Sequence, residues 1–463
     1  MKPNILLLHS HDLGDLIGCY PGNSSVTPHL DKLAAEGVVF EQHFAAAPTC
    51  SPSRGANLTG LAPTRNGLIA LATDGIWEVN RDVKLLPEMM QEAGYKTGNF
   101  GAWHITGDET HRGFDKFSGE FPDSEIVDNA LAWMEEVEGD QPFFCTVGLI
   151  APHRPFTDNW RDLQDPDDVV VPPYLKDTPV VREEMRRFYG DTSMADEQHG
   201  RLIDFIKQKG LDENTIIIFT VDHGIGMPRA KGSLYDPGLK IPLIVRWKGQ
   251  VEGGRRFGGL TCNTDLVPTI MEAIGESRIV PEGIDGKSLW SFVSEGKDVG
   301  HKYVFAEQTW HDFYEPIRSI RTASYKLIWN FEPGPGLQLP PDTLYSSTTG
   351  EMRQMLRDFE RPEFELYDLD ADPDEQVNLA GRVKYSEIEK ELKATLLARL
   401  EEIEDPILKG PIPSVPGYFE HFLYHFNCGG LPLEPGRENW LPIKWPFGRT
   451  ARYRKVSPDK GVQ

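Results

Sequence analysis

The chain has 463 residues, and its 71 Asp and Glu residues against 48 Lys and Arg residues give a formal net charge of −23. Such a field repels nucleic acid and anionic membranes, so we expect neither as a partner. The length exceeds one ordinary hydrophobic core and predicts two domains.

The first predicted element is a buried strand at residues 4–10, in the opening MKPNILLLHSHD. Its apolar run is shorter than a signal-peptide core, and no later run reaches the roughly 20 apolar residues of a membrane span. Few, widely spaced cysteines suit a reducing compartment better than a disulfide scaffold. They are Cys19, Cys50, Cys145, Cys262 and Cys428. We expect a cytoplasmic protein as the sequence stands, or a periplasmic or secreted one if a leader was removed.

Apolar strands and amphipathic helices alternate over the first part of the chain. Strands are predicted at residues 4–10, 96–100, 142–150, 215–221 and 242–247, and helices at 28–36, 86–93, 125–137, 181–208 and 265–274. This alternation predicts an α/β fold with a parallel sheet covered on both faces and ligands bound at the carboxyl ends of its strands. His11-Asp12 and Asp222-His223 both directly follow predicted strands and obey this rule.

The pattern changes at about residue 300, where strand-like YVFAEQTW and SIRTASYKLIWNF precede a long charged helix from Ser386 to Glu404. We predict one domain over 1–300 and a second over 301–463. From about residue 406 the sequence is rich in Pro, Gly and aromatic residues. Its Trp and Phe content is too high for a disordered tail, so we expect an ordered wrapping extension.

The segment Cys50-Ser51-Pro52-Ser53-Arg54 is the most informative part of the sequence. Cys50 or Ser51 can cap a helix whose first turn accepts Pro52, and that helix is predicted to run through Asn57 to Leu61. Cys50 then lies at the positive end of a helix, with Arg54 beside it, which makes an anion site. The alternative is that Cys50 is a small buried hydrophobic residue.

The order Cys-x-Pro-Ser-Arg resembles the signature of type I sulfatases, in which the cysteine is oxidised to formylglycine. Further motifs follow in that family's order from residue 4 to about residue 380. They are HDLG at 11–14, TPHLDKLA at 27–34, GAWH at 101–104, APHR at 151–154, VDHG at 221–224, KGSLY at 231–235 and ELYDL at 365–369. PHR at 152–154, SLYDPG at 233–238 and FAEQTWH at 305–311 are most similar to the N-sulfoglucosamine sulfohydrolases within the family.

The resemblance implies an alkaline-phosphatase-like, mostly parallel sheet flanked by helices. It also implies a smaller C-terminal α+β domain that contains an antiparallel sheet. The expected activity is sulfate hydrolysis by the hydrated aldehyde of formylglycine. One of its two hydroxyl groups attacks sulfur, and the other later expels sulfate. A maturation enzyme that converts Cys50 is then a partner, and a homo-oligomer is compatible with the sequence.

The resemblance also implies one divalent cation, held by Asp12, Asp222, His223 and the formylglycine derived from Cys50. His11 is either a further ligand or a hydrogen-bonding neighbour. The N-sulfoglucosamine sulfohydrolases usually have two aspartates in place of His11-Asp12 and asparagine in place of His223, whereas phosphonate monoester hydrolases and choline sulfatases share Asp-His at 222–223. We expect Ca²⁺, with Mn²⁺ as the alternative that imidazole ligands favour.

The remaining catalytic roles are carried over by motif position. His153 is the expected acid for the leaving group, His104 the base that helps sulfate leave, Lys231 the clamp on a sulfate oxygen, and Arg54 the residue that holds the modified Cys50. Asp222 is also a candidate to take the proton of the attacking hydroxyl.

Ala102 departs from the family pattern, which generally has lysine at this position. An ammonium beside a developing sulfate charge lowers the barrier considerably, so its absence should slow the reaction unless Arg154, Lys240 or His11 substitutes.

Substrate recognition is expected from Arg154 and the segment after residue 300. The candidates are Gln308, Trp310, His311, Tyr314 and Arg318, because aromatic and basic groups together suit a sulfated sugar; Trp310 and Tyr314 as core aromatics are the alternative. The acidic net charge favours an exo-acting site on a short sulfated mono- or oligosaccharide, with N-sulfoglucosamine as the leading substrate. Two other functions stay open: a phosphonate monoester or phosphodiester hydrolase, and a degenerate sulfated-sugar-binding relative.

Overall fold

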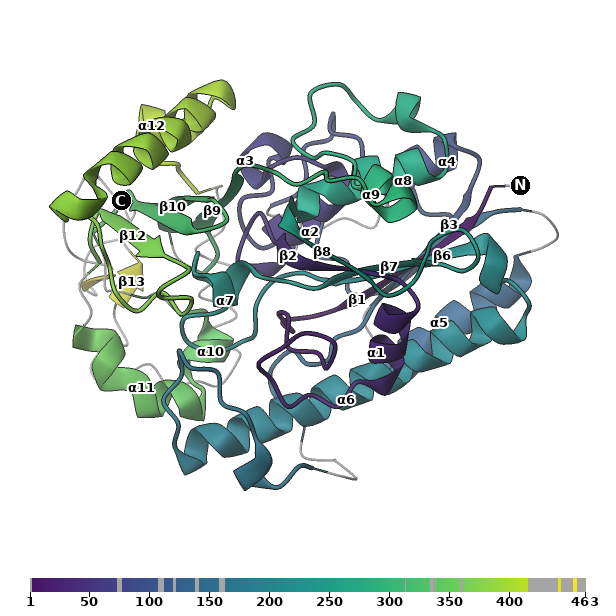
Figure 1. Ribbon diagram of the computed structural model, residues 1–463, viewed down its shortest axis with the longest axis horizontal. Helices are drawn as coiled ribbons and strands as arrows, with labels where there is room; N and C mark the ends of the chain where they lie inside the picture. The colour runs from purple at the N-terminus through teal and green to yellow at the C-terminus, as the bar shows by residue number, and fades with distance from the viewer. Residues whose placement is uncertain are drawn as a thin grey trace.

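The structure is a computed structural model. It describes residues 2–72, 77–106, 112–119, 122–137, 141–157, 163–312, 314–333, 337, 339–358 and 361–414, with two short strands at 440–442 and 453–455. A large sheet flanked by helices lies beside a smaller sheet with its own helices (Figure 1). No described helix has the length and apolar character needed to cross a bilayer.

The large sheet has eight strands and is mostly parallel. In spatial order they are β4 (Lys116–Ser118), β3 (Lys96–Gly101), β5 (Phe143–Gly148), β1 (Asn4–Ser10), β6 (Thr215–Val221), β7 (Leu243–Trp247), β2 (Val38–Phe44) and β8 (Arg255–Cys262). Only β7 runs antiparallel to its neighbours β6 and β2. The predicted fold class is confirmed.

Both faces of this sheet are buried, as the continuous apolar sequence of β1 indicates. Ile5 and Leu7 pack into the core on one face, and Leu6 and Leu8 pack into the core on the other. One layer of helices contains α1 (Pro28–Ala35), α5 (Asp123–Glu136) and α6 (Pro179–Gln208). The opposite layer contains α2 (Cys50–Thr59), α3 (Pro63–Asn66), α4 (Leu86–Glu92), α8 (Leu266–Ala273) and α9 (Trp290–Glu295) (Figure 1).

The smaller sheet is antiparallel and has four strands, in the order β12-β11-β10-β9. The strands are β9 (Val304–Trp310), β10 (Tyr314–Arg321), β11 (Tyr325–Asn330) and β12 (Phe364–Asp368). The charged helix α12 (Ser386–Glu402) packs on β10 and β11, whereas α11 (Ser347–Asp358), which follows the short helix α10 (Pro341–Leu344), packs on α6 of the large-sheet layer. The predicted antiparallel sheet is thus confirmed, while the domain boundary at residue 300 stays a prediction. Most of the predicted wrapping extension lies outside the described residues, apart from 406–414 and the pair β13 (Trp440–Pro442) and β14 (Tyr453–Lys455).

The predicted start of α2 needs a correction. Thr49 is the N-cap residue, with extended backbone and no side-chain capping bond, and Cys50 is the first helical residue. The helix ends at Thr59 because Gly60 takes a left-handed conformation (φ 70°), which glycine adopts without strain. Cys50 therefore lies in the first turn, where backbone N–H groups have no partner within the helix.

A buried ion-pair network joins the smaller sheet to the loop after β6. The Lys326 ammonium on β11 is fully buried and pairs with Asp236 and with Glu375 Oε1, the latter at 2.7 Å. Arg321 on β10 donates to the same Asp236 carboxylate at 2.9 Å. Asp236 begins the short helix α7 (Asp236–Leu239), in the segment that also carries Lys231. The network therefore fixes that segment against the smaller sheet.

We expect Lys326→Met to lower the free energy of unfolding by about 3–5 kcal/mol, because it removes the cation from two buried carboxylates. Urea denaturation followed by circular dichroism measures the change. Lys248→Met is the matched control, since Lys248 is half exposed in its 3.0 Å pair with Asp212 and should contribute at most about 1 kcal/mol. Equal losses in the two variants would contradict the role given to Lys326.

Candidate active site

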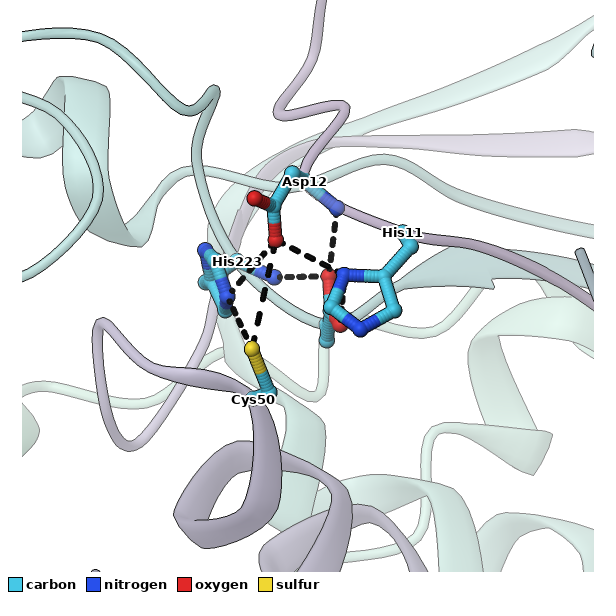
Figure 2. A group of neighbouring side chains, drawn as sticks. His11, Asp12, Cys50 and His223 are labelled. Carbon is cyan, nitrogen blue, oxygen red and sulfur yellow. Dashed lines mark hydrogen bonds and ion pairs between the residues drawn. The ribbon is translucent and has the colours of Figure 1, made fainter. Parts of the chain in front are cut away.

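The candidate site lies where the neighbouring parallel strands β1 and β6 end. His11 and Asp12 follow β1, and Asp222 and His223 follow β6. The backbone N–H groups of Asp12 and His223 donate to the same oxygen, Asp222 Oδ1, at 2.9 and 3.0 Å. Asp12 has a left-handed backbone (φ 54°), an uncommon conformation for a residue with a side chain. The two strand ends thus form one buried cluster (Figure 2).

Cys50 points into this cluster from the first turn of α2 (Figure 2). Its Sγ lies 3.3 Å from His223 Nε2 and 4.0 Å from Asp12 Oδ1. Burial alone would raise the pKa of the Cys50 thiol, but the charges of Lys231, His11 and His223 outweigh it and hold that pKa well below its usual range. The site therefore stabilises a negative charge at this position.

Arg54 fixes the carboxylate of Asp222 beside Cys50. Its Nε and Nη2 both donate to Asp222 Oδ2, at 3.2 and 3.0 Å, and its Nη1 donates to Ala102 O at 3.0 Å. Burial would raise the pKa of Asp222, but His11, His223 and Arg54 lower it far below its usual range. Asp222 therefore stays ionised.

Lys231 lies beside the cluster and is almost fully buried, at 2% side-chain exposure. Its Nζ donates to Asp12 Oδ2 at 2.7 Å and to Asp342 Oδ2 at 2.8 Å. The pKa of Lys231 is raised well above its usual value because the two carboxylates outweigh burial. Asp342, on α10, was missed in the sequence because PPDTL carries no motif and only the tertiary fold brings it here.

Three histidines surround the same point. The His11 ring lies 5.3 Å from the His104 ring and 4.6 Å from the His153 ring, between centroids. His153 Nδ1 lies 2.6 Å from Arg154 O and donates to it, so Nε2 faces the site, 3.3 Å from Lys231 Nζ. Burial lowers the pKa of His11, but Asp222, Cys50 and Asp12 raise it to about 9 in total. The structure therefore brings together all the residues predicted for catalysis.

The five predicted metal ligands fit a divalent cation. One donor atom from each lies within 4.8 Å of the others: His11, Asp12, Cys50, Asp222 and His223. His223 Nδ1 donates to Gly224 O at 2.9 Å, which leaves the Nε2 lone pair facing the cluster, as a metal-bound histidine requires. Two buried carboxylates with imidazoles suit Ca²⁺ or Mn²⁺ by donor chemistry.

Two of the three groups proposed to replace the lysine lost at Ala102 are engaged elsewhere. Lys240 pairs with Asp15 at 3.1 Å, and the Arg154 guanidinium donates to Glu184 at 2.6 Å and to Gly226 O at 2.6 Å. His11 is the one of the three that lies among the site residues. Its Nε2 is buried and has no hydrogen-bond partner among the described residues.

The substrate-binding prediction needs a correction at Arg318 and Gln308. Arg318 is 1% exposed, and its guanidinium donates to Asp405 at 2.6 Å and to Gln308 O at 2.7 Å. Gln308 Nε2 donates to Glu315 at 2.8 Å. These side chains hold β9 and β10 to the segment after α12, and their burial leaves no surface for a substrate.

The same correction applies to Trp310 and Tyr314, which are core aromatics. Their rings pack 4.7 Å apart within the hydrophobic core. Trp310 Nε1 donates to Ile412 O at 3.2 Å, and the Tyr314 hydroxyl accepts from Ile412 N at 2.8 Å. The remaining candidate of this segment, His311, is a neighbour of Cys50; burial lowers its pKa, but Asp312 and Cys50 raise it to about 10. Substrate contact by His311 and Arg154 stays a prediction.

Glu307 should make stability depend on pH. Burial raises the pKa of Glu307 to about 7, although Arg318 lowers it, while an unperturbed Glu has a pKa of 4.5. Between these values the folded state binds more protons than the unfolded state, so stability falls as pH rises from about 5 to 7. We expect Glu307→Gln to reduce this slope in urea unfolding measured across that range. An unchanged slope would show that another group titrates.

A family model described as Sulfatase matches residues 3–276. The chain belongs to the sulfatase family. A second model, described as N-sulphoglucosamine sulphohydrolase, C-terminal, matches residues 229–335 of this sulfatase. The family relation makes the protein a hydrolase of sulfate esters or sulfamates with an alkaline-phosphatase-like fold, as the sequence motifs predicted.

Relatives share most of the length of this sulfatase. An ulvan-active sulfatase of Formosa agariphila is 29% identical over 86% of this chain and 75% of its own. The N-sulphoglucosamine sulphohydrolase of Homo sapiens is 27% identical, over 88% of this chain and 92% of its own length. A structure solved with its substrate D-glucosamine-2-N,6-O-disulfate has a TM-score of 0.70 at 21% identity, covering 89% and 99%. The phosphonate monoester hydrolase of Agrobacterium radiobacter has a TM-score of 0.69 at 20% identity, covering 87% and 96%. These two structures show a shared fold.

Proposed function

We propose that this sulfatase uses a formylglycine made from Cys50 to remove a terminal sulfate from a sulfated saccharide. The observation that carries the proposal is the position of Cys50. It lies at the N-terminus of α2, and its Sγ is 3.3 Å from His223 Nε2. The N-terminus of α2, with Arg54 and Lys231 nearby, provides the positive charge that an anionic sulfate requires.

Hydrated formylglycine and a divalent cation would each supply one part of the chemistry. Hydrated formylglycine supplies two hydroxyl groups on one carbon, for attack on sulfur and for later release of sulfate. A divalent cation held by the residues of the five-membered cluster supplies positive charge for a sulfate oxygen and lowers the pKa of a nearby hydroxyl.

The side chains of this chain then have separate tasks. Lys231 binds a sulfate oxygen, and Arg54 holds Asp222 against the position of residue 50. His153 presents Nε2 to the site and, when protonated there, gives its proton to the leaving atom. His104, whose ring centroid lies 5.3 Å from that of His11, is the proposed base for the release of sulfate.

A cavity of about 720 Å³ supports a saccharide as the substrate. Its size suits one or two sugar rings. Its lining includes Arg154, which follows His153, and Asp342, which contacts Lys231 of the site. The arginines in its wall are paired with carboxylates: Arg154 with Glu184 at 2.6 Å, and Arg187 with Glu183 at 3.1 Å. This charge balance favours a short saccharide over a long polyanion. N-sulfoglucosamine is the leading substrate because the C-terminal family model and the human relative carry that name.

The test combines the modification with turnover. The protein is produced together with a formylglycine-generating enzyme, the Cys50 peptide is weighed by mass spectrometry, and the same sample is assayed on N-sulfated and O-sulfated sugars. We expect turnover in proportion to conversion. Complete conversion without hydrolysis of any sulfated sugar would refute the proposal.

Phosphonate monoester or phosphodiester hydrolysis is the second candidate function. The pair Asp222-His223 favours it, because His223 lies in the cluster where the N-sulfoglucosamine sulfohydrolases usually have asparagine. Matched sulfate and phosphate monoesters, phosphonate monoesters and phosphodiesters separate the two activities. A higher kcat/KM on the phosphonate or diester would favour this second function.

A further inference from the structure

Asp342 borders the site although no sequence motif marks it. It belongs to the short helix α10, and its Oδ2 accepts from Lys231 Nζ at 2.8 Å and lies 3.8 Å from His153 Nε2. Its side chain is 22% exposed and lines the 720 Å³ cavity together with Phe156 and Tyr345. The carboxylate therefore lies between the proposed proton donor and the proposed sugar cavity.

A carboxylate in this place is unfavourable for sulfate alone. Lys231 already pairs with Asp12 at 2.7 Å, so its charge is divided between two carboxylates. Asp342 repels an anion that approaches Lys231 unless the substrate also brings a hydrogen-bond donor or a positive charge. Asp12, His153 and Asp342 do not form a second metal site, because the Lys231 ammonium contacts all three.

The leaving atom is the part of the substrate that can meet Asp342. His153 must reach this atom to protonate it, which places the atom near Asp342 as well. Hydrolysis of an O-sulfate breaks an S–O bond and leaves a neutral hydroxyl group. Hydrolysis of a sulfamate breaks the S–N bond, water provides the fourth sulfate oxygen, and the nitrogen takes one proton to become an amine. Near neutral pH the amine takes a second proton and becomes an ammonium.

We propose that Asp342 binds the leaving nitrogen and makes the site select N-sulfated over O-sulfated amino sugars, an inference that rests on the proposed sulfatase function. The N–H of a sulfamate is a donor to the carboxylate, and the ammonium product forms a charge-assisted hydrogen bond with it. A neutral hydroxyl product gains less from the same contact, so the preference comes from Asp342 itself.

Product binding tests this role without any turnover. Unconverted protein, with Cys50 as the thiol, is titrated in a calorimeter with D-glucosamine, D-galactosamine, N-acetyl-D-glucosamine and D-glucose. We expect one of the amines to bind about 10- to 100-fold more tightly than the neutral sugars. Asp342→Asn should abolish this preference, and it keeps an oxygen acceptor for Lys231. Asp15→Asn should keep it, because the Asp15 carboxylate pairs with Lys240 outside this cavity. Equal affinities for amines and neutral sugars in the unsubstituted protein would overturn the inference.

Turnover provides the second readout on fully converted protein. We expect Asp342→Asn to lower kcat/KM for N-sulfoglucosamine by about 10- to 100-fold, with less than a roughly twofold change for N-acetylglucosamine 6-O-sulfate. Equal losses on both substrates would show that Asp342 only positions Lys231 and would overturn the inference. Failure of the unsubstituted protein on every sulfated sugar refutes the proposed function instead, while the calorimetry still decides what Asp342 binds.

Discussion

The Cys50→Ser variant should lose sulfate hydrolysis by at least about 10⁴-fold in kcat, the scale seen when a nucleophile is removed. Serine offers a single hydroxyl group, so it has no second hydroxyl with which to release sulfate after attack. Steady-state release of sulfate from the best substrate of the sugar panel measures the loss. Retention of a tenth or more of the activity would contradict the role proposed for residue 50.

The matched control for Cys50→Ser is the unsubstituted protein made without a maturation enzyme. It should be as inactive as the variant, because its thiol has not been converted. Both samples should unfold at nearly the same temperature as the converted enzyme, since all three side chains are similar in size and occupy the same buried first turn of α2. A large difference in thermal stability would mean that the loss of activity arises from misfolding.

The Asp222→Asn variant should lose at least about 10³-fold in kcat/KM together with its bound metal. Asp222 receives two guanidinium N–H groups from Arg54 and lies 3.2 Å from His11 Nδ1. The amide removes the negative charge from this pair and from the metal cluster, and so leaves buried cations without a counter-charge. Elemental analysis of the purified protein measures the metal, and urea unfolding should show a loss of about 3–5 kcal/mol.

Asp15→Asn is the matched control for this substitution. Asp15 also follows β1, but its carboxylate is partly exposed and pairs with Lys240 at 3.1 Å, outside the cluster. The control should keep its metal and most of its activity. If Asp222→Asn also kept stoichiometric metal, Asp222 could not be one of the principal ligands.

The strands that carry the site could be predicted from the sequence because they are continuously apolar. Residues 4–10 and 215–221 form β1 and β6 with the predicted bounds. Three strands of the large sheet were missed. Polar residues interrupt the pattern of two of them: β2 contains Glu41-Gln42, and β8 contains Arg255-Arg256 and two glycines. The third, β4, is only three residues long. Local hydrophobicity therefore identified the five central strands and missed both edges, β4 on one side and the pair β2 and β8 on the other.

Some side chains of the site could be predicted from the sequence, and others could not. Residues directly after β1 and β6 were predictable, since the ends of parallel neighbours meet at one edge of a sheet. Asp342 was not, because its place depends on contacts with Lys231 and His153 that are distant in sequence. Arg318 and Trp310 were misplaced because a basic or aromatic residue looks the same in sequence whether it faces a ligand or the core. For Arg318, the buried ion pair with Asp405 shows that the side chain faces the protein interior and not a ligand.

The burial of Cys50 also has a consequence for the time course of synthesis. His223, which contacts its Sγ, is 173 positions later in the chain. At a typical rate of about 5–20 residues per second, the ribosome needs roughly 10–35 s to add that stretch. Until then the strand end that covers Cys50 does not exist, and the CSPSR segment is open to a modifying enzyme. For the conversion proposed for Cys50, the window would therefore close when the nascent chain completes β6 and folds.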